Sequence, residues 1–170
     1  RLNIAHTDNN YIAPNTGFKK NTISFNGNYQ VTQRVKLTTS LNYNNRTSDN
    51  LPAFGISNGS LGYFMMFLMP SVDINWYKPI WQNGKENLEQ LNPFSAWSSN
   101  PYFLMYVDKN PLSSNQIVGN VKTDIKISEN WDVMGRLSMN SLTQLRETQR
   151  GYSSKKHPRG YYGRQDVASQ

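Results

Sequence analysis

The stretch TISFNGNYQVTQRVKLTTSLNYN, residues 22–44, decides the fold class of this chain. Its odd positions are Ile, Phe, Gly, Tyr and Val up to residue 31, and Val, Leu, Thr, Leu and Tyr from residue 35 onward, whereas every even position is polar. Strict alternation of this kind predicts two β-strands that each have one apolar and one polar face. Between the two runs, residues 32–34 predict a tight hairpin turn.

The same pattern returns in the second half of the chain. Residues 117–127 and 131–139 alternate in the same phase, and a second three-residue turn, residues 128–130, separates them. In all four runs the charges lie at even positions and none lies at an odd position. Runs of this length suit a membrane strand, which needs about 9–11 residues, better than a globular strand, which averages about 5–6.

Long and short connections alternate along the chain. All eight prolines lie in the connections, as expected because proline cannot donate a hydrogen bond inside a paired strand. Short turns at one end and long loops at the other are typical of an outer-membrane β-barrel. Within the longest loop, a helix is expected near residues 58–69, begun by Ser57 or Asn58 and ended by Pro70. The expected strands are residues 1–8, 19–31, 35–46, 115–127 and 131–149, and the expected long loops are residues 47–114 and 151–170.

The expected fold is therefore all-β, an antiparallel transmembrane β-barrel segment with long extracellular loops. Five strands cannot close a barrel, because about eight is the smallest number that can. The strands then belong either to a larger barrel or to one that several copies of the chain build together, and the long central loop fits the second possibility poorly. A soluble, secreted β-sandwich that binds carbohydrate through loop aromatics also stays open, because a strand buried on one face alternates in the same way.

The composition excludes several other classes of protein. The 170 residues include no cysteine, so neither a disulfide framework nor a thiolate metal site is expected. The net charge of +7 and the basic cluster at residues 155–159 invite a nucleic-acid interpretation, but no recognised nucleic-acid-binding fold surrounds the cluster, and no such partner is expected. There is no phosphate loop, no dinucleotide fingerprint and no metal-ligand spacing around His6 or His157. We expect no enzyme, no metal site and no cofactor.

Three groups of side chains are candidates for contacts in such a barrel. Polar residues at even strand positions would face the lumen, and aromatic residues near the ends of the apolar runs would form a girdle at the membrane interface. Aromatic rings of the long loop would stack on a substrate or a lid, although such rings serve equally well to hold a loop in place. The lumen-facing candidates are Lys36, Asn42, Asn44, Lys122, Asp124 and Arg136; the girdle candidates are Tyr29, Tyr43 and Trp131; and the substrate or lid candidates are Trp76, Tyr77, Trp81, Trp97, Tyr102 and Phe103.

Several pieces of the chain resemble the SusC/RagA class of TonB-dependent outer-membrane transporters. The longest pieces are IAPNTGFKKNTISFNGNYQVTQRVKLTTSLNY (residues 12–43) and NPYFLMYVDKNPLSSNQIVGNVKTDIKISENWDV (residues 100–133). The shorter pieces LMPSVDI (68–74) and GRLSMN (135–140) occur in the family's order as well. One departure is Asn115-Gln116, where family members often carry a basic residue, so the roles of individual residues are not copied from the family.

The resemblance implies a plugged barrel of about 22 strands in the bacterial outer membrane, of which this chain supplies part of the wall. It implies active import of oligosaccharides or peptides in Bacteroidota-type bacteria. The implied partners are a SusD-type surface lipoprotein that caps the barrel, outer-membrane lipid, and TonB, which acts through a plug domain and a TonB box that these residues do not contain.

Overall fold

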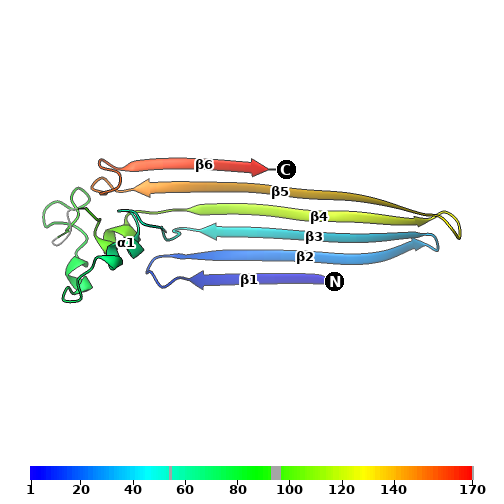
Figure 1. Ribbon diagram of the computed structural model, residues 1–170, viewed down its shortest axis with the longest axis horizontal. Helices are drawn as coiled ribbons and strands as arrows, with labels where there is room; N and C mark the ends of the chain where they lie inside the picture. Colours follow the sequence, from blue (N-terminus) through cyan, green and yellow to red (C-terminus); the bar gives the residue numbers. More distant parts are fainter. Residues whose placement is uncertain (54, 93–96, 170) are drawn as a thin grey trace.

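In the computed structural model, which describes residues 1–53, 55–92 and 97–169, the strands form a single six-stranded antiparallel sheet (Figure 1). Each strand pairs with its neighbours in sequence, in the order β1-β2-β3-β4-β5-β6. The expected all-β class is confirmed, and the sheet is not closed. The strands are β1 (Leu2–Asn10), β2 (Gly17–Thr32), β3 (Val35–Ser48), β4 (Leu112–Lys126), β5 (Asp132–Arg150) and β6 (Tyr161–Ser169).

The sixth strand corrects the expectation of a loop over residues 151–170. Tyr161–Ser169 pair with residues 142–150 of β5, so the loop ends at residue 160. The sequence does not show this strand as an alternation because Arg164 and Asp166 lie at positions of the same parity as Tyr162. Their partners across the sheet are Glu147 and Leu145, in the polar part of β5, where neither face of the strand has to be apolar.

The two predicted tight turns lie at the end of the sheet that is remote from the long loops. At the first turn Thr32 pairs with Val35 after an irregularity in the register between Gln30 and Thr32. At the second, Ile127 N donates to Trp131 O at 2.9 Å, which encloses residues 128–130 as expected. The two hairpins therefore have short connections at the same end (Figure 1).

The register gathers the apolar side chains on one face of the sheet. Phe25 of β2 pairs with Leu41 of β3 and with Leu2 of β1, and Val121 of β4 pairs with Leu137 of β5. No other described part of the chain forms a layer over this apolar face, and Leu137 keeps 77% of its surface exposed.

The long loop builds a small core of its own at one end of the sheet. Helix α1 (Leu61–Met66), the 3-10 helix η1 (Ile74–Tyr77) and helix α2 (Pro101–Tyr106) meet there (Figure 1). The buried side chains Phe64, Tyr77, Phe103, Leu104 and Met105 form this core. We call the described residues of 49–111 and 151–160 the loop cap.

Helix α1 confirms a helix in the expected region but is shorter than residues 58–69. It begins after Ser60, whose hydroxyl accepts a hydrogen bond from Tyr63 N at 3.2 Å. Among the described residues, no helix is both long and apolar enough to cross a membrane.

Candidate functional site

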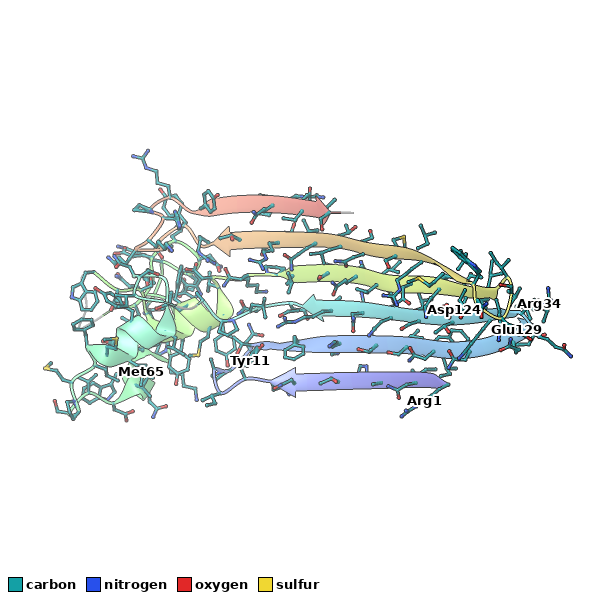
Figure 2. All side chains as sticks on the ribbon, turned by 45° about the vertical axis from the view of Figure 1, so that its right-hand side comes forward. Arg1, Tyr11, Arg34, Met65, Asp124 and Glu129 are labelled. Carbon is teal, nitrogen blue, oxygen red and sulfur yellow. The ribbon has the colours of Figure 1, made fainter. Side chains whose placement is uncertain are left out.

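The six residues expected to face a lumen all lie on the polar face of the sheet. Lys36 pairs with Asp124 and Lys122 pairs with Arg136 across neighbouring strands. Lys122 Nζ lies 2.8 Å from Asp124 Oδ1, and this ion pair offsets the repulsion between Lys122 and Arg136. Figure 2 shows Asp124 near the turns that carry Arg34 and Glu129, so this charged group lies at the end away from the loop cap.

Asn42 and Asn44 share the polar face nearer to the loop cap. Asn44 Nδ2 donates to Asn42 Oδ1 at 3.1 Å, and Asn44 Oδ1 accepts from Thr22 Oγ1 at 2.9 Å. Amide and hydroxyl groups thus cover the polar face between its charged groups.

Aromatic residues and a row of amides bound the apolar face at its two ends. Tyr29 and Trp131, at the turn end, keep 67% and 70% of their surface exposed. Tyr43 lies near the other end, where its hydroxyl donates to Asn115 Oδ1 at 3.0 Å. Asn115 belongs to a row of paired residues that crosses the sheet just beyond the last apolar residues.

This row, the polar rung, consists of His6, Asn21, Asn45 and Asn115. His6 Nδ1 and Asn21 Oδ1 are 2.6 Å apart, Asn21 Nδ2 donates to Asn45 Oδ1 at 3.4 Å, and Asn45 Nδ2 donates to Asn115 Oδ1 at 2.8 Å. Four strands are joined by side chains at one level. The apolar face therefore ends sharply toward the loop cap.

The six aromatic residues proposed from the sequence for substrate contact divide into a buried and an accessible set. Tyr77 and Phe103 keep 1% and 0% of their surface exposed, so their rings support the loop cap and offer no face to a ligand. Trp81 packs edge-on against Phe103, with ring centroids 5.5 Å apart. Trp76 and Trp97, in contrast, keep 50% and 43% of their surface exposed.

The accessible rings occur in clusters. Trp97 packs edge-on against Tyr63 and Phe67 of the α1 region, at 5.3 and 5.0 Å between centroids. Tyr102 is half-buried and stacks on Tyr106, with ring planes 9° apart. Both clusters lie on the loop cap.

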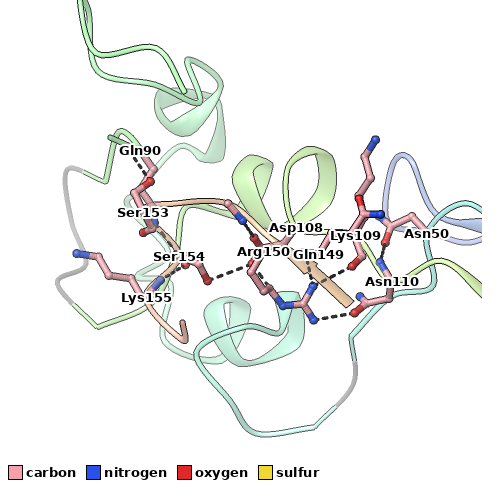
Figure 3. Close-up of polar contacts among 12 residues, drawn as sticks. Asn50, Gln90, Asp108, Lys109, Asn110, Gln149, Arg150, Ser153, Ser154 and Lys155 are labelled. Carbon is pink, nitrogen blue, oxygen red and sulfur yellow. Dashed lines mark hydrogen bonds and ion pairs between the residues drawn. The ribbon is translucent and has the colours of Figure 1, made fainter. Parts of the chain in front are cut away.

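A buried ion pair fastens the loop cap to the end of β5. Asp108, which follows α2, accepts hydrogen bonds from Gly151 N at 3.0 Å and from Ser154 Oγ at 3.3 Å (Figure 3). Its Oδ2 atom lies 3.9 Å from Arg150 Nε. Burial raises the pKa of the Asp108 carboxyl to about 6, because desolvation outweighs these partners.

Arg150 continues the network toward the start of the loop cap. Its Nη2 donates to Asn110 Oδ1 at 2.7 Å, and Asn110 N donates to Asn50 Oδ1 at 3.0 Å. Asn110 Nδ2 and Asn50 Nδ2 donate in turn to Leu51 O and Met105 O. These contacts join residues that are 40 to 60 positions apart in sequence.

Asn100 connects further segments of the loop cap through hydrogen bonds. It is fully buried, caps α2 through its Oδ1, and donates through Nδ2 to Tyr77 O at 2.8 Å and Leu91 O at 2.7 Å. Gln90 Oε1 accepts from Asn100 N at 2.6 Å, and Gln90 N donates to Ser153 Oγ at 3.0 Å. Sequence reasoning missed Asp108, Arg150 and Asn100, although an Asn before Pro101 is a recognisable helix start.

Comparison of this chain with protein-family models, with curated proteins and with solved structures finds no match in any of the three. In the part of the chain that the structure describes, no three His, Cys, Asp or Glu side chains gather where they could hold a metal ion.

Proposed function

We propose that the sheet is part of the wall of a transmembrane β-barrel in the bacterial outer membrane, with its apolar face toward lipid and its polar face toward the lumen. The observation that carries the proposal is the uncovered apolar face, which has no charged side chain among the strand residues between the turns and the polar rung. Soluble monomers rarely expose contiguous apolar patches of more than a few hundred Å².

The height of the apolar face supports this orientation. Along β4 and into the turn, it extends from Ile117 to Ile127, which is about 34 Å at about 3.4 Å per residue. A strand tilted by about 45° would then cross about 24 Å, close to the apolar band of about 25 Å on membrane barrels. Tyr29 and Trp131 at one border and Tyr43 at the other occupy the positions of aromatic girdles.

A soluble carbohydrate-binding sandwich is less well supported. In a sandwich a second sheet packs about 10 Å from the first and covers its apolar face. All described strands instead belong to one sheet. Among the described residues, no further strand pairs with the backbone edges of β1 and β6. In lipid such edges have to be paired, so the proposed barrel requires further strands beside both.

We propose further that the complete barrel is the plugged importer that the sequence resemblance implies, with about 22 strands. In this proposal the loop cap lies at the extracellular end, where the exposed rings Trp76 and Trp97 are available to a substrate or to a SusD-type lipoprotein. The cargo is an oligosaccharide or a peptide, and TonB supplies energy through a plug.

The orientation is tested by placing one charge on each face. A charge in the lipid face costs about 2–4 kcal/mol at the midplane, so Leu37→Asp and Val121→Asp should abolish assembly in the outer membrane. Ser40→Asp and Asn120→Asp, on the polar face of the same two strands and paired with each other across them, should assemble normally. Assembly is measured as the protease-resistant, heat-modifiable fraction in outer membranes, and equal loss from both faces would contradict the orientation.

A further inference from the structure

A pocket opens on the polar face where the strands reach the loop cap. Its volume is about 520 Å³, and its walls come from the cap-side ends of β3, β4, β5 and β6 and from residues 51–53 and 110–111 of the loop cap. Tyr11, Arg46, Arg146 and Tyr161 are among the residues that line it. The pocket lies on the opposite face from the apolar band, so a lipid head group is not its natural occupant.

The register turns two arginines toward this pocket. Arg46 pairs with Ser114 of β4, and Arg146 pairs with Leu112 of the same strand and with Gln165 of β6. Both have the parity of the polar-face residues on their strands. Arg46 belongs to β3 and Arg146 to β5, the two neighbours of β4, and both line the same pocket.

Neither arginine is neutralised within the described residues. Arg46 lies over the Phe18 ring, with its guanidinium carbon 4.5 Å from the ring centroid, and its buried Nε atom has no hydrogen-bond partner there. Arg146 Nε donates to the neutral Gln144 Oε1 at 3.1 Å. Arg150, in contrast, is matched by the carboxylate of Asp108.

The other charged residues beside the pocket are engaged elsewhere. Glu147 accepts a hydrogen bond from Tyr162 Oη at 2.6 Å, and Arg164 Nε lies 3.1 Å from Asp166 Oδ2. These four side chains have the parity of the opposite face. The pocket is thus left with two unpaired cations and no matching carboxylate on its own face among the described residues.

We propose that this pocket binds a carboxylate group of an acidic oligosaccharide on its way through the lumen. A guanidinium offers parallel N–H donors that match a carboxylate, and the stack on Phe18 holds that of Arg46 in one plane. Tyr11 and Tyr161 supply rings for sugar faces, and the amide of Gln165 supplies a partner for hydroxyls. This inference rests on the proposed function, because it takes the polar face to be the lumen.

The test measures binding of trigalacturonate and of its neutral methyl ester to the complete, detergent-solubilised protein by calorimetry. The carboxylate of the acid can form charge-assisted hydrogen bonds with the arginines, and the neutral ester cannot. The acid should therefore bind about tenfold tighter than the ester. Arg46→Gln and Arg146→Gln should each remove most of this preference, and raised salt should weaken it. Arg34→Gln, the same substitution in a turn at the other end of the sheet, should leave it unchanged.

Equal affinity for acid and ester in the parent protein, or a preference that survives both substitutions, would overturn the inference. If Arg46→Gln does not assemble because the stack on Phe18 is lost, Arg146→Gln decides alone, since its guanidinium has only Gln144 as a described partner. If triglutamate and not trigalacturonate shows the arginine-dependent preference over its neutral glutamine counterpart, the assignment to an oligosaccharide is wrong.

The outcome is separable from that of the proposed function. A protein that assembles in the membrane but shows no preference for the acid overturns the carboxylate pocket and leaves the barrel intact. A protein that keeps the preference but tolerates Leu37→Asp overturns the barrel alone.

Discussion

In the loop cap, the sequence pattern does not predict which side chains are buried and which are exposed. Tyr77 is buried, whereas the adjacent Trp76 is half exposed, and both were equal candidates for ligand contact in the sequence. An irregular loop has no period from which burial can be derived, so which ring packs inward depends on distant partners such as Asn100 and Phe64. Within the strands, by contrast, parity alone separates Leu37 from Lys36.

Gly151 is one such residue, and it should not tolerate a side chain. A Cβ atom there would lie 2.6 Å from Phe103 Cζ and 2.7 Å from Val107 Cγ1, so Gly151→Ala would force the core of the loop cap apart. Overpacking of this kind costs about 1–3 kcal/mol. Limited proteolysis should show faster cleavage of the loop cap, while Gly62→Ala, in open space within α1, should show no increase.

Asp108 should make the stability of the loop cap depend on pH. Its pKa rises from 3.8 to about 6 in the folded protein, so the folded state holds the proton more tightly than the unfolded state. The free energy of opening should therefore be highest below pH 4 and should fall as the pH rises from about 4 to about 6.

Amide hydrogen exchange of α2, corrected for the intrinsic effect of pH on exchange, measures this change. Asp108→Asn should flatten the dependence because it leaves no group to titrate. Protection of α2 that increases over the same pH interval would contradict the assignment.

At the scale of elements, the central strands are the most predictable part of the fold. One face is uncharged in each of β2, β3, β4 and the first half of β5, and the alternation of apolar and polar residues in the sequence predicts this face. β6 is not predictable in this way because it lies beside the polar part of β5. Helix α2 has six residues, too few for a helical period, and only its Asn-Pro start identifies it.

The start of α2 should matter more than the start of η1. Asn100 is fully buried and connects α2 to Tyr77 O and Leu91 O, so Asn100→Ala removes a cap and leaves buried groups without partners. We expect a loss of about 2 kcal/mol or more in the stability of the loop cap. Asp73→Ala removes the exposed cap of η1 and should cost about 1 kcal/mol or less. Hydrogen exchange in the loop cap compares the two, and equal losses would contradict a linking role for Asn100.

At the scale of the whole molecule, the sequence predicts a two-faced sheet but not what lies against each face. Alternation identifies the apolar face and the lengths of the connections identify the turn end, and the structure contains both. It also contains an open sheet with edges along β1 and β6, because closure requires strands beyond the six described. Whether the sheet belongs to a membrane barrel therefore depends on whether its apolar face contacts lipid.

Spin labels on neighbouring residues answer this question most directly. A label on the apolar face is placed by Val121→Cys or Leu137→Cys, and a label on the polar face by Asn120→Cys or Ser138→Cys. Val121 pairs with Leu137 across β4 and β5, and Asn120 pairs with Ser138, so the two sets lie at the same level of the sheet. In the complete protein in membranes, the first pair should be accessible to oxygen and shielded from a water-soluble nickel chelate, and the second pair should show the reverse. If labels on both faces are equally accessible to the nickel chelate, the apolar face is not in lipid and the barrel account is wrong.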